Sequence, residues 1–444
     1  MQTAPVLAVV VCHDGERWLP LALSALRRST VRPQRVIAVD TGSTDRTPAL
    51  LAEAGAGESR IVDDVLTVPE GTGFAEAVAK GVEHGRNQGE DAGQWLWVLH
   101  DDCAPDADCL AGLLNAAAAA PSAGVLGPIA VDWAEPRLIV EAGLSTDASG
   151  HRRSDIGLGR SNRQADAGDE NHSRAEQSTE VLAMPSAGAL IKLDLWDTLG
   201  GFDREFALFR EDLDFGWRAN VAGKTVLCVP RARVRHARAL RHGDRAVAAL
   251  TGVAPDTAAA ADRAYGLRTF LINCSRWSYA LGVPRLVLLC ALRGIGFFLV
   301  KEGVRARAEF FAIRYLAGGH AGLQAARADR AHLRAHAVQA RQEGPAKYRR
   351  GGNVRGLFVG RATRLRHAAR AGVLALVRRG VASDAALGRL PETATVRSAW
   401  VPPEALRAET TGKPAVTGAR ARDVVAVPIG GDSNAVTGEP ADTP

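Results

Sequence analysis

The chain has 444 residues, of which 46% are hydrophobic, so it is long and apolar enough to fold into two or three domains. It carries 55 Lys and Arg against 49 Asp and Glu, a net charge of +6. Its six cysteines form no CxxC pair and no Cys/His cluster with zinc spacing, which excludes a zinc-finger framework and indicates reduced thiols in the cytosol.

The first five residues lack a basic stretch followed by a long apolar one, so we expect no secretory signal. Residues 6–11, 36–39 and 95–99 are apolar runs of the kind found in strands covered on both faces. Helical patterns alternate with them, over 18–28, from a cap at Ser43 or Thr44 to Leu51, 75–84 and 110–120. This alternation predicts an α/β fold with a mostly parallel sheet, whose ligands bind beyond the carboxyl ends of the strands.

The middle of the chain contains a long polar connection. Residues 145–180 are rich in Gly, Asp, Asn and Ser, which indicates either a functional lid or disorder. Beyond it we predict a short helix over 194–199, a helix over 213–222 closed by Gly223, and a strand over 225–229 ended by Pro230.

From Arg263 onward the chain becomes strongly basic. Residues 263–379 carry about 23 Lys and Arg against about 4 Asp and Glu, which favours an anionic partner such as phospholipid headgroups. Residues 281–300 are long and apolar enough to cross a bilayer, but Pro284, Arg285 and Arg293 favour an in-plane or re-entrant element at least as well. Shorter apolar pieces occupy 308–316 and 373–377, and the tail from 402 onward has a disordered composition.

Acidic groups follow two of the predicted strands. Asp40 precedes a Gly-Ser-Thr turn, where a carboxylate either accepts hydrogen bonds from a nucleotide or caps the turn. The tripeptide His100-Asp101-Asp102 follows the apolar strand at 95–99 and offers hard oxygen ligands for Mg²⁺ or Mn²⁺. Its alternative interpretation is a solvated acidic turn.

A second acidic group, Glu211-Asp212, lies about 110 residues later, ahead of Trp217 and Arg218. It fits a general base, or an acidic helix start that complements the helix dipole. His236 follows a predicted strand and fits either a metal ligand or a structural histidine.

Taken in order, these segments resemble glycosyltransferase family 2, the inverting enzymes of GT-A fold, over roughly residues 5–240. The similarity extends to rhamnosyl- and galactofuranosyltransferase-like members, which carry a histidine after the base. The matching segments are Val6–Val11, Val36–Asp45, Leu99–Asp102, Ala187–Ile191, Gly200–Asp203, Glu211–Asp214 and Arg218–Gly223. Two positions depart from the family pattern: His100 replaces the first aspartate of DxD, and 77–81 replaces an Ala-Arg-Asn-x-Gly motif.

The resemblance implies a role for each matching residue. Asp40 and Asp101 would bind the nucleotide, Asp102 and His236 would hold the divalent cation, and Asp212 would be the catalytic base. Supporting positions are His100, Glu211, Asp214, Trp217 and Arg218, with core packing as the alternative for Trp217. The implied reaction moves a sugar from a UDP- or dTDP-sugar to a hydroxyl of a cell-envelope or lipid-linked glycan, with inversion.

We therefore expect a GT-A catalytic domain over 1–245, a basic helical, membrane-associated region over 246–385 and a disordered tail over 386–444, at the cytoplasmic face of a cell membrane. Two alternatives remain. One is a catalytically degenerate glycosyltransferase-like module for membrane assembly, and the other is a nucleotidyltransferase, although Cys12–Glu16 matches its phosphate loop poorly. We expect no nucleic-acid partner, because few aromatic residues are interleaved with the basic ones.

Overall fold

The computed structural model describes residues 2–58, 60–88, 93–154, 178–242, 244 and 258–343. The predicted tail, the apolar piece at 373–377 and most of the predicted lid at 145–180 therefore lie outside the described residues. The described part of that lid segment begins with a small two-stranded sheet, in which β8 (Ser145–Thr146) pairs with β9 (Arg152–Arg153).

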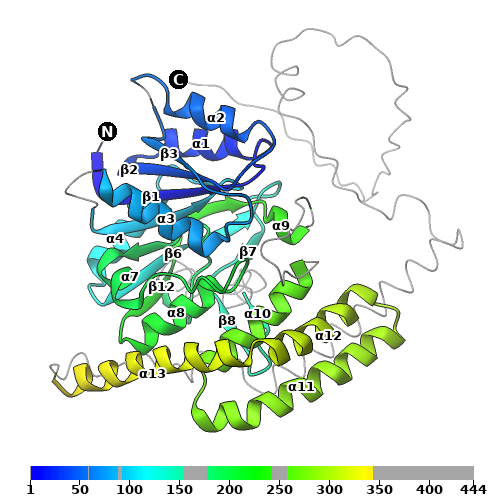
Figure 1. Cartoon of the computed structure of the whole chain (residues 1–444). Helices are drawn as coiled ribbons and strands as arrows, with labels where there is room; N and C mark the ends of the chain where they lie inside the picture. Colours follow the sequence, from blue (N-terminus) through cyan, green and yellow to red (C-terminus); the bar gives the residue numbers. More distant parts are fainter. Residues whose placement is uncertain are drawn as a thin grey trace, which may run out of the picture. The chain divides into compact units, whose positions relative to one another are not determined.

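A ten-stranded mixed sheet forms the centre of the structure (Figure 1). Along its main path the order is β10-β12-β6-β11-β4-β1-β2-β3, while β5 pairs with β12 and β7 pairs with β6. The strands are β1 (Gln2–Cys12), β2 (Val31–Asp40), β3 (Asp64–Thr67), β4 (Trp95–His100), β5 (Cys103–Pro105), β6 (Ala123–Asp132), β7 (Ile139–Glu141), β10 (Thr179–Glu180), β11 (Leu190–Lys192) and β12 (Thr225–His236).

The predicted mixed, mostly parallel sheet flanked by helices is confirmed. Strands β4, β1, β2 and β3 are parallel neighbours, and β11 enters antiparallel beside β4. In the register of these strands Val11 lies opposite His100, and Cys12 lies opposite Asp40. The carboxyl ends of β1, β2 and β4 consequently meet at one edge of the sheet, where the sequence places its acidic groups.

Helices cover both faces of this sheet because β1 is apolar from Ala4 to Cys12 and buried on both sides from Val6 onward. Its even residues, such as Ala8, pack with α1, α2 and α4, whereas its odd residues, such as Val9, pack with α3, α7 and α8. The helices are α1 (Leu19–Arg27), α2 (Thr47–Gly55), α3 (Phe74–Asn87), α4 (Cys109–Ala119), α7 (Leu193–Leu199), α8 (Glu211–Val221) and α9 (Ala239–His242). Gly81 allows α3 to pack closely on β1, since a Cβ there would lie 2.7 Å from Val9.

Two local predictions are wrong. The cap expected at Ser43 or Thr44 is absent: α2 begins after Arg46, and the Ser43 hydroxyl is used by Asp40 instead. The strand expected to end at Pro230 continues to His236, because an irregularity in its pairing between Val229 and Arg233 accommodates the proline.

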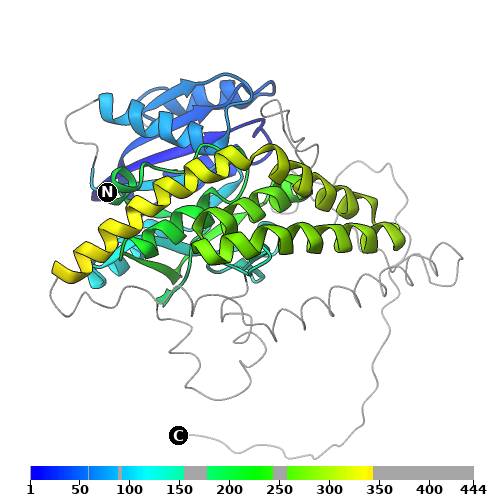
Figure 2. The same ribbon diagram turned by 60° about the horizontal axis from the view of Figure 1, so that its bottom comes forward.

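Four helices follow: α10 (Ala258–Asn273), α11 (Arg276–Leu299), α12 (Gly303–Gly318) and α13 (His320–Glu343). Figure 2 shows α11 and α12 side by side, and α13 continues from the end of α12 and packs against α10 and α8. One hydrophobic cluster joins Leu213 and Trp217 of α8 to Leu267 and Leu271 of α10. Among the described helices, α11 alone is long and apolar enough to cross a membrane.

Candidate active site

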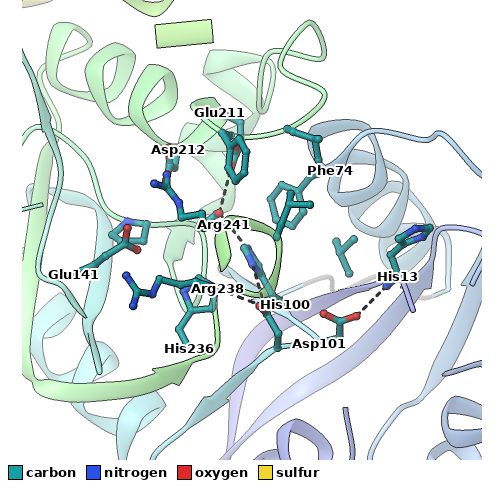
Figure 3. Close-up of a pocket in the computed structure, with 18 of the residues that line it drawn as sticks. His13, Phe74, His100, Asp101, Glu141, Glu211, Asp212, His236, Arg238 and Arg241 are labelled. Atoms are coloured by element: carbon teal, nitrogen blue, oxygen red, sulfur yellow. Dashed lines mark hydrogen bonds and ion pairs between the residues drawn. The ribbon is translucent and has the colours of Figure 1, made fainter. Parts of the chain in front are cut away.

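A pocket lies at the sheet edge where β1, β2 and β4 end (Figure 3). Figure 3 shows His13 and Asp101 on the side of the N-terminal strands, with Glu211 and Asp212 on α8 across the pocket from them. The ionisable side chains in its wall are His13, His100, Asp101, Asp102, Glu141, Arg152, Glu211, Asp212, His236, Arg238 and Arg241. Seven of the ten residues singled out from the sequence are thus in or beside this one pocket.

Asp102 and His236, predicted as metal ligands, lie together. Asp102 Oδ1 is 3.5 Å from His236 Nε2 and 3.8 Å from His100 Nδ1. Pairing of β12 with β5 brings His236 to this position, and the backbone amide of Ala239 donates to Asp102 Oδ2 at 2.9 Å. The chain after β12 therefore contacts the carboxylate that follows β4, and Ala239 lies 137 residues after Asp102.

His100 is oriented by a chain of hydrogen bonds. Its Nε2 lies 3.1 Å from the Ser186 hydroxyl, which in turn donates to Glu211 Oε1 at 2.9 Å. This contact leaves Nδ1 of His100 on the side of Asp102. The Phe74 ring, 4.6 Å between centroids, packs edge-on against the imidazole.

These three residues fit a divalent cation. One ligand atom from each of His100, Asp102 and His236 lies within 4.8 Å of the other two. Two imidazole nitrogens and one carboxylate oxygen form a donor set that suits first-row transition metals better than an all-oxygen set does. His100 thus adds a third ligand atom at the position where the family pattern has an aspartate.

The acidic pair occupies the first turn of α8. Phe209 and Arg210 have positive φ angles of 62° and 72°, and this bend starts the helix with its acidic turn in the pocket wall. Asp212 Oδ2 is 3.0 Å from Arg152 Nη1, and its Oδ1 accepts from the Leu213 amide. Within the part of the chain that the structure describes, Glu211 has no such cationic partner at hydrogen-bond distance. Burial and the neighbouring Asp212 raise the pKa of its carboxyl to about 7.

Arg152 and Glu141 complete the acidic side of the pocket, and the sequence did not predict either. Arg152 reaches from β9 to both Asp212 and, at 3.1 Å, Glu141. Burial alone would lower the pKa of Arg152, but the two carboxylates raise it above its ordinary value. Its place in a long polar connection carried no signal, because only folding brings β9 against α8.

Arg238 and Arg241 form a cationic rim after β12. Arg238 Nη2 lies 3.7 Å from Asp132 Oδ2, and Arg241 Nη2 lies 3.7 Å from Asp262 Oδ1. Burial, together with the charge of Arg152, lowers the pKa of Arg241. Apolar side chains of the same wall lie beside them, namely Leu208, Phe209 and Leu240.

On the nucleotide side, Asp101 is buried and accepts from the His13 amide at 2.9 Å. A Cβ at Gly15 would lie 2.4 Å from Asp101 Oδ2, so this contact requires glycine there. Asp40 is buried at the end of β2, and its Oδ1 accepts from the amide and hydroxyl of Ser43. The pocket wall includes the following residue, Thr41, rather than Asp40 itself.

Three of the predicted supporting residues point away from the pocket. Asp214 is fully buried and accepts from Arg218, Asn273 and Arg330. Arg218 also donates to two backbone carbonyl groups ahead of α8, and Trp217 packs in the cluster shared with α10. These residues hold α8 in place, and core packing is confirmed for Trp217.

A family model and a curated relative match this chain. Residues 7–156 match the family model described as glycosyl transferase family 2. The chain is 28% identical over 244 residues to the N-acetylglucosaminyl-diphospho-decaprenol L-rhamnosyltransferase of two Mycobacterium tuberculosis strains, covering 53% of this chain and 76% of the relative.

Solved structures show more distant similarity. GalNAc-T7 with UDP, GalNAc and Mn²⁺ is 16% identical with a TM-score of 0.44, covering 60% of this chain and 47% of that one. The mannosyltransferase PcManGT from Pyrobaculum calidifontis, with GDP-Man and Mn²⁺, is 15% identical with a TM-score of 0.38, covering 77% and 90%. S. aureus TarS 1-349 with UDP-GlcNAc is 14% identical with a TM-score of 0.40, covering 78% and 92%.

Proposed function

Residues 7–156 belong to glycosyltransferase family 2, and from that premise we propose that the protein moves a sugar from a nucleotide-diphosphate donor to a hydroxyl group of a lipid-linked or cell-envelope glycan. The observation that carries this proposal is the convergence of Asp102, His236 and Asp212 in one pocket at the ends of the strands. These residues come from three separate segments of the chain, and all three line the same pocket.

The donor is proposed to be a UDP- or dTDP-sugar, with Asp40 and Asp101 on the nucleotide side. His100, Asp102 and His236 would hold a divalent cation, Mn²⁺ or Mg²⁺. Bound there, the cation supplies charge neutralisation for the departing diphosphate. The backbone amide of Ala239 holds the Asp102 carboxylate at this position, and Ser186 holds the His100 imidazole.

Asp212 is proposed as the general base. In a single displacement with inversion, the acceptor oxygen bonds to the anomeric carbon while the bond from that carbon to the diphosphate oxygen breaks. The acceptor proton passes to the Asp212 carboxylate, and the electron pair of the broken bond leaves with the nucleoside diphosphate. Arg152 holds this carboxylate in the pocket wall through its contact with Asp212 Oδ2.

The acceptor class follows from two kinds of support. The similar rhamnosyltransferase acts, by its name, on N-acetylglucosaminyl-diphospho-decaprenol, a lipid-linked sugar. In this chain Arg238 and Arg241 offer cationic groups suited to a diphosphate, next to the apolar side chains of the same wall. We therefore propose a lipid-linked diphospho-sugar acceptor and a place of work at the cytoplasmic face of a cell membrane.

A base substitution tests the mechanism. Asp212→Asn should lower kcat for transfer by roughly 10²–10⁴-fold, because the amide cannot take the acceptor proton. Donor binding, measured by calorimetry with UDP and Mn²⁺, should change little. The control is Asp197→Asn, which alters an exposed pair with Arg86 and should leave transfer intact. Near-normal transfer by a folded Asp212→Asn protein would remove Asp212 from the base role.

The assay also separates the alternatives. A screen of UDP- and dTDP-sugars with detergent-solubilised polyprenyl-diphospho-N-acetylglucosamine should release nucleoside diphosphate and extend the acceptor by one sugar. Donor binding without any turnover by the unmodified protein would instead identify a degenerate module. Release of inorganic pyrophosphate would identify a nucleotidyltransferase.

A further inference from the structure

Helix α11 exposes an apolar stripe along its length, which the exposed Arg285 interrupts between Leu281 and Leu288. Its members follow one another at intervals of three, four or seven residues, which places them on one face of the helix. They are Trp277, Leu281, Leu288, Leu292, Ile295 and Leu299, each between 50% and 82% exposed. Scattered apolar side chains are normal on a protein surface, but an aligned stripe of this length marks a surface that contacts an apolar partner.

The opposite face of α11 is packed against protein. Gly282, Leu286, Cys290 and Gly294 are buried there, and a Cβ at Gly294 would lie 2.9 Å from the Phe310 ring of α12. Only 22% of the most apolar 18-residue window of α11 is buried, so this helix is not a core helix. It is covered on one side and exposed on the other.

Of the two arginines counted against a membrane crossing, Arg293 belongs to the packed face, whereas Arg285 is exposed. Arg293 Nε contacts Glu309 Oε1 at 2.8 Å, and Arg263 Nε contacts Glu309 Oε2 at 2.7 Å. Arg285 donates to the carbonyl of Ala148, ahead of β9. A helix fixed on one side by a buried ion-pair network cannot be surrounded by lipid tails, which argues against a span.

Charged residues around the stripe are almost all basic. Arg276 precedes Trp277, Lys301 follows the stripe, and both are exposed. Between residues 276 and 319 the acids are Glu302 and Glu309, of which Glu309 is buried and paired. An apolar face flanked by exposed cations complements a bilayer that contains anionic phospholipids.

We propose that the exposed face of α11 docks in the plane of an anionic phospholipid bilayer, with Trp277 and the leucines of the stripe inserted at the headgroup boundary. The biological value of this surface rests on the proposed function, since a lipid-linked acceptor is reached from the bilayer. Helix α10 connects the two: Asp262 pairs with Arg210 beside the pocket, while the next residue, Arg263, pairs with Glu309 of α12.

Flotation of the full chain with vesicles tests this docking without donor or acceptor. The unmodified protein should float with phosphatidylcholine vesicles containing phosphatidylglycerol at low salt, and at least tenfold less with phosphatidylcholine alone. Trp277→Gln/Leu288→Gln/Ile295→Gln should lower the bound fraction at least tenfold. The matched control Leu21→Gln/Leu138→Gln changes two comparably exposed apolar residues elsewhere and should float as the unmodified chain does.

Two further measurements test the role of the basic residues beside the stripe and whether α11 lies on the bilayer or spans it. Arg276→Gln and Lys301→Asn should each weaken binding to anionic vesicles roughly fivefold, since a basic residue near the surface contributes about 1 kcal/mol. Alkaline carbonate should release the bound protein from the vesicles, whereas a spanning helix stays. All variants should keep the circular dichroism spectrum of the unmodified chain.

Three results would overturn the docking proposal. They are failure of the unmodified chain to float at low salt, retention after carbonate, and normal flotation of the triple variant. A triple variant that floats normally and forms a smaller oligomer than the unmodified chain would assign the stripe to a second copy of the chain. Donor hydrolysis with UDP-sugars, followed in the same samples, reports on the proposed transferase chemistry separately, because none of these variants touches the pocket.

Discussion

Glu211 and Asp212 show how two adjacent carboxylates acquire different surroundings. Asp212 is paired with Arg152, whereas the described contact of Glu211 is the Ser186 hydroxyl, and its Oε2 is buried without a hydrogen-bond partner among the described residues. Burial and the charge of Asp212 raise the pKa of Glu211 to about 7, so this carboxyl titrates near neutral pH. Its titration should therefore be visible in the stability of the protein.

The sign of that effect follows from linkage. The folded state binds the Glu211 proton more tightly than the unfolded state, whose pKa is near 4.5. The free energy of unfolding therefore falls as pH rises from about 4.5 to about 7, by about 3 kcal/mol for a shift of this size. Glu211→Gln removes this loss. The free energy of unfolding of the variant, minus that of the unmodified chain, should therefore increase as pH rises from about 5 to about 8.

Urea unfolding in metal-free buffer measures this difference. The control is Glu76→Gln, which alters an exposed carboxylate paired with Lys80 and should show no such pH dependence. A constant difference between Glu211→Gln and the unmodified chain across this pH range would contradict the raised pKa of Glu211.

His100 determines the expected metal preference. Two imidazoles and one carboxylate favour Co²⁺ or Mn²⁺ over Mg²⁺, which prefers oxygen ligands. We predict that the unmodified chain binds Mn²⁺ at least tenfold more tightly than Mg²⁺, a difference of about 1.4 kcal/mol in binding free energy. In His100→Asp this difference between the two metals should be smaller. Calorimetry with each metal alone measures both, and His84→Asn, which alters a histidine paired with Asp64 outside the pocket, is the control. Equal affinities in the unmodified chain would refute the role of His100 as a ligand.

At the scale of elements, α8 has two functions on two faces. Its first turn presents the acidic pair to the pocket, and the next turn places Asp214 in a buried network with Arg218, Asn273 and Arg330. Burial would raise the pKa of Asp214, but the two guanidinium groups lower it below its ordinary value. The network fixes the helix between α10 and α13 and thereby fixes the direction of the acidic pair.

Breaking this network should destabilise the fold. Asp214→Asn leaves two guanidinium groups buried without their carboxylate, a change that costs about 3–5 kcal/mol in comparable buried pairs. The free energy of unfolding from urea titration at neutral pH measures the loss. Asp203→Asn alters a more exposed carboxylate that also contacts Arg330, and it should cost less. A loss below about 1 kcal/mol for Asp214→Asn would mean that packing alone holds α8.

On the scale of the whole molecule, the basic C-terminal helices are built onto the catalytic part. The hydrophobic cluster of α8 continues into α10. A partly exposed ion pair links α10 to Arg241 of the pocket rim, and a buried one links it to α12. The exposed stripe of α11 is therefore fixed relative to the substrate pocket. The proposed docking surface and the proposed lipid-linked acceptor would therefore be held at a constant distance from each other.

The sequence by itself determined the alternation of strands and helices, the edge of the sheet where the acids gather and the family, because these depend on local apolar runs and short motifs. Asp102, Asp212 and His236 were identifiable as candidate site residues because each lies in a short motif. Only the tertiary structure revealed that Arg152 and Glu141 complete the pocket, that Asp214 and Arg218 are structural, and that Arg293 pairs with Glu309. These contacts join residues far apart in the chain, and the charge of a side chain does not specify its partner until packing brings the two together.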